Sequence, residues 1–295
     1  MINVTPMKKL LSIIILLSLC SALRTQAQCT SENTAFKSGE TLLYDLYFNW
    51  KFVWVKVGTA SMNVSSATYQ GEPAYRTYLI TRGNAKADRF FVMRDTLITY
   101  TGLDLAPRYY FKGALEGKTY RKDEVWYSYP SGQCAMKMRF QRNNDYVIDN
   151  QYSSRYCAYD MLSMMLRARS FDASKMKVGH RINFLMAEGK KCEWNSIVYR
   201  GKKKFKMENQ PVTYRCLVFS FVEKNKKGKE EDVITFYITD DKNHIPVRLD
   251  MNLNFGTAKA FLTGASGLRN PQDSRIKKTD YTYNIYMDEA EDTVK

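Results

Sequence analysis

Residues 44–50 have the sequence Tyr44-Asp45-Leu46-Tyr47-Phe48-Asn49-Trp50, in which every second side chain from Tyr44 onward is large and apolar. Successive side chains of a strand point to opposite faces, so this period of two predicts a β-strand with one buried face. A denser apolar run follows at residues 52–57 and ends at Gly58, and residues 60–64 alternate again. This part of the chain therefore predicts consecutive strands.

The same pattern recurs along the chain, with turn signals such as Gln70-Gly71-Glu72-Pro73 and Asn143-Asn144 between the segments. Further strands are predicted at residues 74–81, 97–100, 109–112, 124–129, 136–141, 182–186, 192–199, 212–222, 233–238, 247–252 and 258–262. Strands joined by tight turns, without regular helices between them, favour antiparallel pairing. With roughly a dozen strands, we expect a mainly β protein whose antiparallel sheet is strongly curved or closes into a barrel-like β-roll, which hides strand edges.

Residues 159–169 are the exception and predict one short α-helix. The segment contains strong helix formers and no β-branched residue, and Asp160 is placed to cap its N-terminus. Met161, Met164, Met165 and Ala168 fall on one helical face. We expect this face to fill the core beside the sheet; the alternative is an adaptable, methionine-rich binding surface.

The N-terminus has the three parts of a cleavable secretory signal. Lys8 and Lys9 precede an apolar run, Leu10–Leu19, and small residues lead to Ala27, as signal peptidase requires. The run is shorter than the roughly 20 residues that span a bilayer, which favours cleavage over an uncleaved anchor. Lipidation of Cys29 is disfavoured because the residue before it is not small. Residues 1–27 are therefore predicted to be removed, and the mature chain to lie in the periplasm or at the outer membrane of a Gram-negative cell.

Composition indicates one globular body. The chain is 44% hydrophobic and 14% aromatic, and residues 28–265 have the length of a single extended β-rich domain. Residues 266–295 lose the strand pattern and end in an acidic stretch at 288–292. They are predicted to form a polar, partly disordered tail.

The chain is basic, with a net charge of +15, and removal of Lys8, Lys9 and Arg24 with the signal lowers this by three to +12. Lysines gather at residues 202–206 and 224–229, which we expect to be solvated hairpin tips. An acidic envelope partner, such as anionic lipid, lipopolysaccharide phosphate, a lipoprotein or a glycan, is the more specific interpretation. Nucleic acid is not an expected partner, because an exported protein meets little of it.

The mature chain keeps Cys29, Cys134, Cys157, Cys192 and Cys216, so at least one thiol is unpaired within the chain. We predict a disulfide between Cys134 and Cys157, because the turn at Asn143-Asn144 brings their flanks together. Cys192 with Cys216 is a second candidate pair across neighbouring strands. No C-x-x-C is present, which gives no support for a thioredoxin-type or zinc site.

Motifs for catalysis or cofactors are incomplete. Gly113 to Thr119 resembles a phosphate-binding loop but has one residue too few between its glycines. The chain has only His180 and His244, and the aspartates near His244 are better explained as turn formers than as zinc ligands. We therefore expect no metal and no cofactor. Acids such as Asp45, Asp95, Glu116 and Glu124 leave open a carboxylate-dependent hydrolase, whose two acids must face one cleft.

The candidate ligand-binding residues are aromatic or basic. Trp50, Phe52 and Trp54 share a face if their strand runs straight, where they form part of the core or a surface for sugar rings or acyl chains. Arg94 lies beside Asp95 in an apolar segment, and this pair is expected to be structural before it is catalytic. We predict no catalytic residue.

An ordered set of short segments resembles the secreted bacterial family known as domain of unknown function 3108, especially members from Bacteroides-like organisms. The segments are Gly39–Tyr44, Val57–Ala60, Arg94–Thr96, Tyr159–Ser163, Tyr199–Gly201, His244–Leu249 and Phe255–Gly256. The resemblance implies an envelope location and a β-rich fold, and it implies no activity, because it brings no catalytic or binding residues.

Three functions remain open at this point. The leading one is a non-enzymatic envelope protein that binds or carries an amphipathic ligand, because a curved sheet readily encloses a cavity. The second is a carboxylate-dependent hydrolase of envelope polysaccharide. The third is a scaffold or assembly partner without a small ligand.

Overall fold

The computed structural model describes residues 29–50, 53–143, 146–208, 210–225, 227–253 and 256–276. The strands are β1 (Thr41–Trp50), β2 (Val53–Tyr69), β3 (Glu72–Gly83), β4 (Met93–Gly102), β5 (Pro107–Glu116), β6 (Thr119–Ser128), β7 (Cys134–Arg142), β8 (Tyr146–Ser154), β9 (Ala158–Tyr159), β10 (Arg181–Glu188), β11 (Lys191–Lys206), β12 (Thr213–Lys224), β13 (Glu230–Thr239), β14 (Pro246–Leu253), β15 (Gly256–Ser266) and β16 (Arg275–Ile276). The helices are α2 (Ala85–Asp88) and α3 (Met161–Ala168), with short 3-10 helices η1 (Pro130–Gly132) and η2 (Ala173–Lys175). The predicted signal peptide lies outside the described residues.

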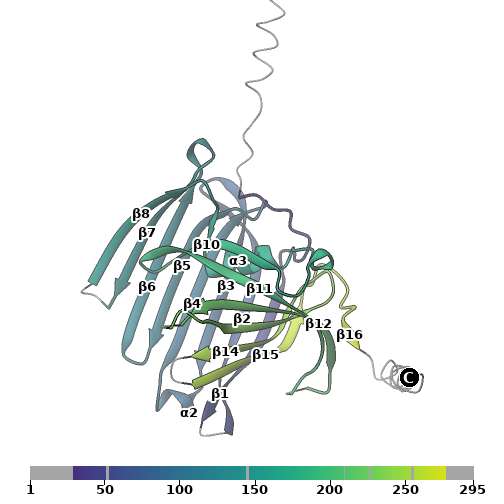
Figure 1. The fold of residues 1–295 in the computed structure, drawn as a ribbon. Coiled ribbons are helices and arrows are strands. Elements are labelled where there is room, and N and C mark those ends of the chain that lie inside the picture. Colours follow the sequence, from purple (N-terminus) through teal and green to yellow (C-terminus); the bar gives the residue numbers. More distant parts are fainter. Residues whose placement is uncertain are drawn as a thin grey trace, which may run out of the picture.

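All described strands belong to one sheet, in the order β8-β7-β6-β5-β4-β3-β2-β1-β15-β14-β13-β12-β11-β10-β9, with β16 added to β12. The pairs are antiparallel except β9–β10, which is parallel. Most neighbours in the sheet are also neighbours in sequence; the exceptions are β12 with the short β16 and β1 with β15, where Thr41 lies opposite Ser266. Figure 1 shows this sheet curling until β10 and β11 face the strands of the first half.

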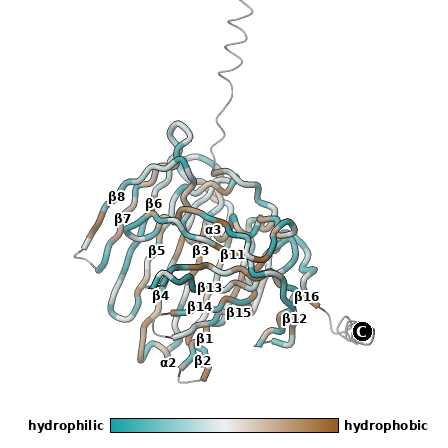
Figure 2. The backbone as a smooth tube through the Cα atoms, viewed as in Figure 1, coloured by the Kyte–Doolittle hydropathy of each residue, from teal (hydrophilic) through white to brown (hydrophobic). Residues whose placement is uncertain are grey.

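The end strands β8 and β9 are not paired with each other in the described part of the chain, and side chains join the two halves of the sheet instead. Lys112 of β5 forms an ion pair with Glu188 of β10 at 2.6 Å, and the Asn150 amide of β8 donates to the Lys190 carbonyl at 2.7 Å. The protein is therefore mainly β, with a nearly closed, barrel-like antiparallel sheet, which confirms the predicted fold class. Figure 2 shows how hydrophobic and hydrophilic segments are distributed along the strands of this sheet.

Helix α3 lies against the concave face of the sheet. Its Leu166 belongs to a core cluster that contains Phe36, Leu42 and Phe261, whereas its Leu162 belongs to a second cluster around Tyr110, Val125 and Met136. The helix therefore joins two parts of the core. This confirms the predicted helix near residues 159–169. The predicted core-facing side is confirmed only in part: Met164 is buried, but Met161 is exposed, and the core contacts come from Leu162 and Leu166 instead.

Two buried polar contacts hold the ends of α3. At the N-terminus, the Asp160 carboxylate accepts from the Leu162 and Ser163 backbone N–H groups at 3.0 and 2.9 Å, and Thr99 of β4 donates to it at 3.1 Å. At the C-terminus, the buried Arg169 guanidinium forms a bidentate pair with the buried Glu40 carboxylate. The helix is thus fixed to the sheet at both ends.

The predicted disulfides are wrong. The structure joins Cys29 to Cys157, whose Cα atoms are 5.3 Å apart, and Cys134, Cys192 and Cys216 are free thiols. The turn between β7 and β8 does bring their flanks together, but the residue opposite Cys134 is Ser154, three positions short of Cys157. Cys192 lies opposite Ala187 and not opposite Cys216, which rules out the second predicted pair.

The first part of the predicted tail packs on the sheet. The Asn270 backbone N–H donates to the Asn243 side chain at 2.9 Å, and the buried Ser274 hydroxyl donates to Asp241 at 2.6 Å. Residues 275–276 then form β16. The remaining tail, 277–295, lies outside the described residues.

The lysine clusters occupy different places. Residues 224–229 lie at the β12–β13 turn, as predicted. The prediction of a hairpin tip is wrong for residues 202–206. They form the end of β11, with exposed lysines, and pair with β12. The register of this pairing shifts between Tyr199 and Gly201. Among the described residues, no helix has the length and apolarity needed to cross a membrane.

Candidate functional site

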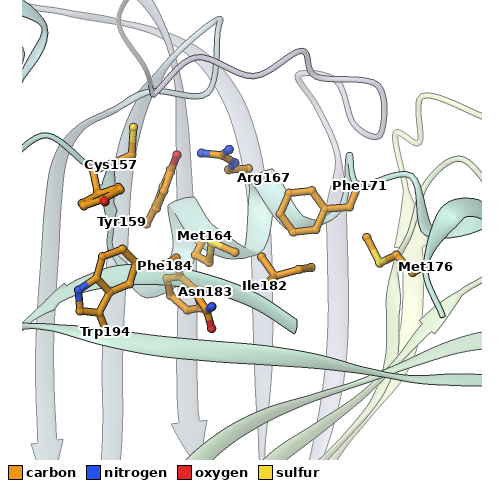
Figure 3. Close-up of a pocket in the computed structure, with 11 residues that line it drawn as sticks. Cys157, Tyr159, Met164, Arg167, Phe171, Met176, Ile182, Asn183, Phe184 and Trp194 are labelled. Atoms are coloured by element: carbon orange, nitrogen blue, oxygen red, sulfur yellow. The ribbon is translucent and has the colours of Figure 1, made fainter. Parts of the chain in front are cut away.

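A cavity of about 340 Å³ opens between α3 and strands β9–β11 (Figure 3). Its walls come from several segments that meet only in the folded chain. The lining residues are Tyr156, Cys157, Tyr159, Met164, Arg167, Phe171, Met176, Ile182, Asn183, Phe184 and Trp194. Most are aromatic or aliphatic, so the cavity has the composition of a small-molecule site: an apolar wall with few polar groups.

The floor of the cavity is set by α3 and β10. Tyr159, Met164 and Phe184 are buried together in one cluster, against which Phe171 and Ile182 pack. Met164 and Arg167 are three residues apart, so they project from the same side of α3. Because Asp160 fixes where the helix begins, it also fixes the direction of both side chains.

Arg167 is the charged group of this cavity. Its guanidinium lies over the Tyr159 ring, 4.8 Å from the ring centre, and no carboxylate pairs with it among the described residues. Burial lowers the pKa of Arg167, because removing water disfavours its charged form. A half-buried cation without an acidic partner, next to an apolar wall, suits a ligand with an anionic group and an apolar body.

The mouth of the cavity is aromatic. Tyr156 and Trp194 are 48% and 56% exposed, and their rings meet edge to face with centroids 5.2 Å apart. The Arg155 guanidinium lies 5.1 Å from the Tyr156 ring centre. Cys157, beside them, is held by its disulfide to Cys29. The covalent bond therefore ties one wall of the cavity to the beginning of the described chain.

Of the aromatic binding residues predicted from the sequence, Trp54 is the one whose side chain the structure describes. Trp54 is 37% exposed at the start of β2, and the Lys259 ammonium group lies 4.2 Å from its ring centre. Phe52 and the side chain of Trp50 are outside the described residues. Trp54 does not line the cavity, and the role of all three aromatic residues in binding stays a prediction.

Arg94 pairs with Asp88 of α2 and not with its sequence neighbour Asp95. Adjacent strand residues point to opposite faces, which is why the expected pair does not form. The Arg94 guanidinium also donates to the carbonyl of Met93 at 2.8 Å. Its donors are thus used within the β3–α2–β4 corner.

Two carboxyl groups with raised pKa values, Asp95 and Asp123, lie on β4 and β6, on either side of β5. Burial raises the pKa of Asp95 to about 6, with a further contribution from Glu116, and burial also raises that of Asp123 to about 6. Asp95 pairs with Ala114, whereas Asp123 pairs with Lys112 on the other side of β5. Two strand spacings and this offset put their Cα atoms more than about 9 Å apart. Lys112 lies between them in register.

The segment around His244 was considered as a possible metal site. No group of three or more His, Cys, Asp and Glu side chains in the described residues is arranged to hold a metal ion. Asp241 accepts from the Asn243 backbone N–H at 3.0 Å and from the Thr239 hydroxyl at 2.9 Å. Both contacts support the interpretation of this segment as a turn.

Comparison with known proteins agrees with the fold. The family described as "Protein of unknown function (DUF3108)" matches residues 43–263. A crystal structure of a beta-barrel-like protein of domain of unknown function DUF1849 from Brucella abortus is similar, with a TM-score of 0.50 and 10% identity, over 79% of this chain and 99% of that one.

A second solved structure is a putative exported protein with a YmcC-like fold from Bacteroides fragilis, which aligns at 10% identity and a TM-score of 0.31 over 80% of this chain and 99% of that one. The chain has no match among curated proteins. The family match covers most of the sheet, from β1 to β15, and both the resemblance noted in the sequence and the barrel-like fold agree with it. The chain therefore belongs to the DUF3108 family of proteins of unknown function.

Proposed function

We propose that this protein is exported to the cell envelope and binds an amphipathic ligand, an apolar chain with an anionic group, in the cavity beside α3, without catalysing a reaction. The observation that carries the proposal is the half-buried Arg167, which has no carboxylate partner in the described chain and borders an apolar cavity of about 340 Å³. Small-molecule sites occupy about 300–1,000 Å³, so this cavity suits one acyl chain better than a whole phospholipid.

Export is supported by two independent features. The sequence around Lys8, Leu10–Leu19 and Ala27 has the pattern of a cleavable signal. The disulfide between Cys29 and Cys157 belongs to an oxidising compartment. A periplasmic location of a Gram-negative, Bacteroides-like cell remains part of the proposal.

The hydrolase alternative has weaker support. Asp95 and Asp123 have the raised pKa values that an acid catalyst needs, but their strands are not adjacent and neither residue lines the cavity. The aromatic mouth and the unpaired cation favour binding of an acyl carboxylate or phosphate over hydrolysis of a neutral polysaccharide.

The first test is native mass spectrometry of the mature protein, purified gently from its own envelope. An extra mass that denaturation releases is expected, and its identification gives the ligand class. A clean apoprotein mass, together with no binding of the fluorescent fatty acid cis-parinaric acid, would rule the proposal out.

The second test uses a matched pair of arginine variants. Replacement of the cavity residue, Arg167→Met, keeps the bulk and removes the charge, so the affinity for cis-parinaric acid should fall by about tenfold or more, as expected for a hydrogen bond to a charged group. Arg142→Met changes an exposed arginine at the end of β7 and should leave the affinity unchanged. Equal affinities for both variants would contradict a role for Arg167.

A further inference from the structure

The hairpin loops at the two edges of the sheet differ in charge. In an antiparallel sheet, alternate loops lie at the same edge. One edge carries the β1–β2, β3–β4, β5–β6, β7–β8, β10–β11, β12–β13 and β14–β15 loops, and the other carries β2–β3, β4–β5, β6–β7, β11–β12 and β13–β14. Between the strand ends, the described loop residues of the first edge include Lys86, Arg89, Lys118, Lys190, Lys227 and Lys229 against Asp88. Those of the second include Asp104, Glu208, Asp240 and Asp241 against Lys242.

The basic edge also exposes apolar side chains. Around the β1–β2 and α2 loops, Val53, Val55 and Phe90 are 61%, 45% and 82% exposed, with Phe91 and Trp54 at 47% and 37%. Figure 2 shows the hydrophobic start of β2 beside α2. We call these five residues the hairpin-tip surface. Apolar side chains gathered at the end of a sheet mark a contact surface more often than isolated ones do.

The loops that form this surface are bound to one another. The Asn84 side-chain amide, next to α2, donates to the Lys56 carbonyl of β2 at 2.7 Å. The Gly117 N–H of the β5–β6 turn donates to the Val92 carbonyl at 2.8 Å, and the Phe91 ring lies against Gly117. The α2 loop is therefore hydrogen-bonded both to β2 and to the β5–β6 turn, which lie on either side of it. Figure 1 shows α2 at the same end of the sheet as β1.

The charges on this surface are available to an outside partner. Lys86, Arg89 and Lys118 are exposed, and none of them forms an ion pair with a described residue. The nearby acids are already used: Asp88 by Arg94 and Asp45 by Lys56. The surface thus combines protruding apolar side chains with unpaired cations.

We propose that the hairpin-tip surface docks on the surface of an anionic phospholipid membrane. Aromatic and aliphatic side chains favour the boundary between headgroups and acyl chains, and lysine and arginine favour the phosphates beside it. The backbone of a hairpin tip has unpaired polar groups, so only the side chains enter the apolar layer. This surface is separate from the cavity, and the inference does not depend on the ligand proposed for it.

The test is co-sedimentation of the mature protein with vesicles that contain phosphatidylglycerol, compared with vesicles of phosphatidylcholine alone. Binding to the anionic vesicles is expected, with a loss as salt concentration rises. The double variant Phe90→Ser/Phe91→Ser should reduce the partition coefficient at least tenfold. The double variant Lys86→Gln/Arg89→Gln should reduce it about fivefold for each cation removed.

Matched controls come from the other edge. Leu103 is 55% exposed in the β4–β5 loop, and Lys242 is exposed in the β13–β14 loop. Leu103→Ser and Lys242→Gln should leave vesicle binding unchanged, as should Arg167→Met in the cavity. Val53→Ser provides a second apolar variant if the Phe90 and Phe91 change lowers the unfolding midpoint.

Three results would overturn the proposal. The first is no binding of the wild-type chain to anionic vesicles. The second is an equal loss of binding in the Leu103 and Lys242 controls. The third is a wild-type chain that self-associates in sedimentation velocity through this surface, with the association and not lipid binding lost in the Phe90 and Phe91 variant.

Discussion

The surroundings of α3 and the hairpin-tip surface use charge in opposite ways. Around α3, Glu40 and Arg169 are buried and paired with each other, and Asp160 is buried against backbone N–H groups. At the tips, Lys86 and Arg89 are exposed without an acidic partner in the described chain. A buried group that loses its partner destabilises the fold, whereas an exposed group can be replaced at little cost to stability. Substitutions around α3 should therefore lower the free energy of unfolding, and substitutions at the tips should change binding alone.

The largest effect is expected from Glu40→Ala. It leaves the buried Arg169 guanidinium without its carboxylate, which costs about 3–5 kcal/mol of unfolding free energy. Urea unfolding followed by fluorescence measures the loss. Glu193→Ala, which breaks an exposed pair with Lys191, is the control and should leave the midpoint unchanged. Equal urea midpoints for the two variants would show that buried and exposed ion pairs contribute equally to stability, contrary to the comparison above.

The disulfide beside the cavity should give the next largest effect. Cys157→Ser opens a link between residues 128 apart in sequence and should cost about 2–4 kcal/mol. Cys192→Ser changes a thiol outside the disulfide and should cost less. Peptide mapping without reduction is expected to recover Cys29 joined to Cys157, and recovery of Cys134 in a disulfide would show that the structural assignment is wrong.

Loss of the helix cap should rank third. Asp160→Ala removes the acceptor for two backbone N–H groups of α3 and for the Thr99 hydroxyl, at a cost of about 2 kcal/mol. Asp160→Asn keeps a cap acceptor and should cost less. Because the cap directs Arg167 and Met164 toward the cavity, the alanine variant should also bind cis-parinaric acid more weakly. Wild-type affinity in the alanine variant would show that the Asp160 cap is not needed to orient the cavity residues.

The last effect is confined to a narrow range of pH. Burial raises the pKa of Asp123 from 3.8 to about 6, so between about pH 4 and 6 the folded chain holds this proton more tightly than the unfolded chain. The stabilisation is complete below about pH 4 and is lost as the pH rises to about 6. In the Asp123→Asn variant, the urea midpoint should decrease less between about pH 4 and 6 than it does in the wild-type chain. Asp149→Asn, at a group whose pKa the Arg139 hydrogen bond lowers, should leave the slope above pH 4 unchanged.

The sequence predicts strands well where one face is buried. The alternation at Tyr44 to Trp50 corresponds to β1, and the Asp160 signal corresponds to the cap of α3. Strand β8 was not predicted, because none of its residues is buried and its side chains carry no apolar alternation. An edge strand of this kind depends on its neighbour β7, and not on its own side chains.

The candidate site was harder to predict, because its residues are distant in sequence. Cys29 and Cys157 meet through the curvature of the whole sheet, which no local turn reveals. The aromatic side chains of the cavity come from separate segments, and Trp194 resembles any other aromatic residue of a strand. One signal was present: the predicted helix placed Met164 on a single face, and that residue lines the cavity. Arg167, one turn further along, was not recognised as its cation.

The pairing of β1 with β15 has a consequence for how the chain folds. Apart from β12 with the short β16, the other antiparallel pairs join successive strands, so each half can form as a series of local hairpins. The contact of Thr41 with Ser266 requires a much longer loop to close, which is slow. Amides of β1 and β15 that bond across this junction should therefore gain hydrogen-exchange protection last. Until then, β1 and β15 are open strand edges to which another chain can add, so this interval is when the folding chain is most exposed to aggregation.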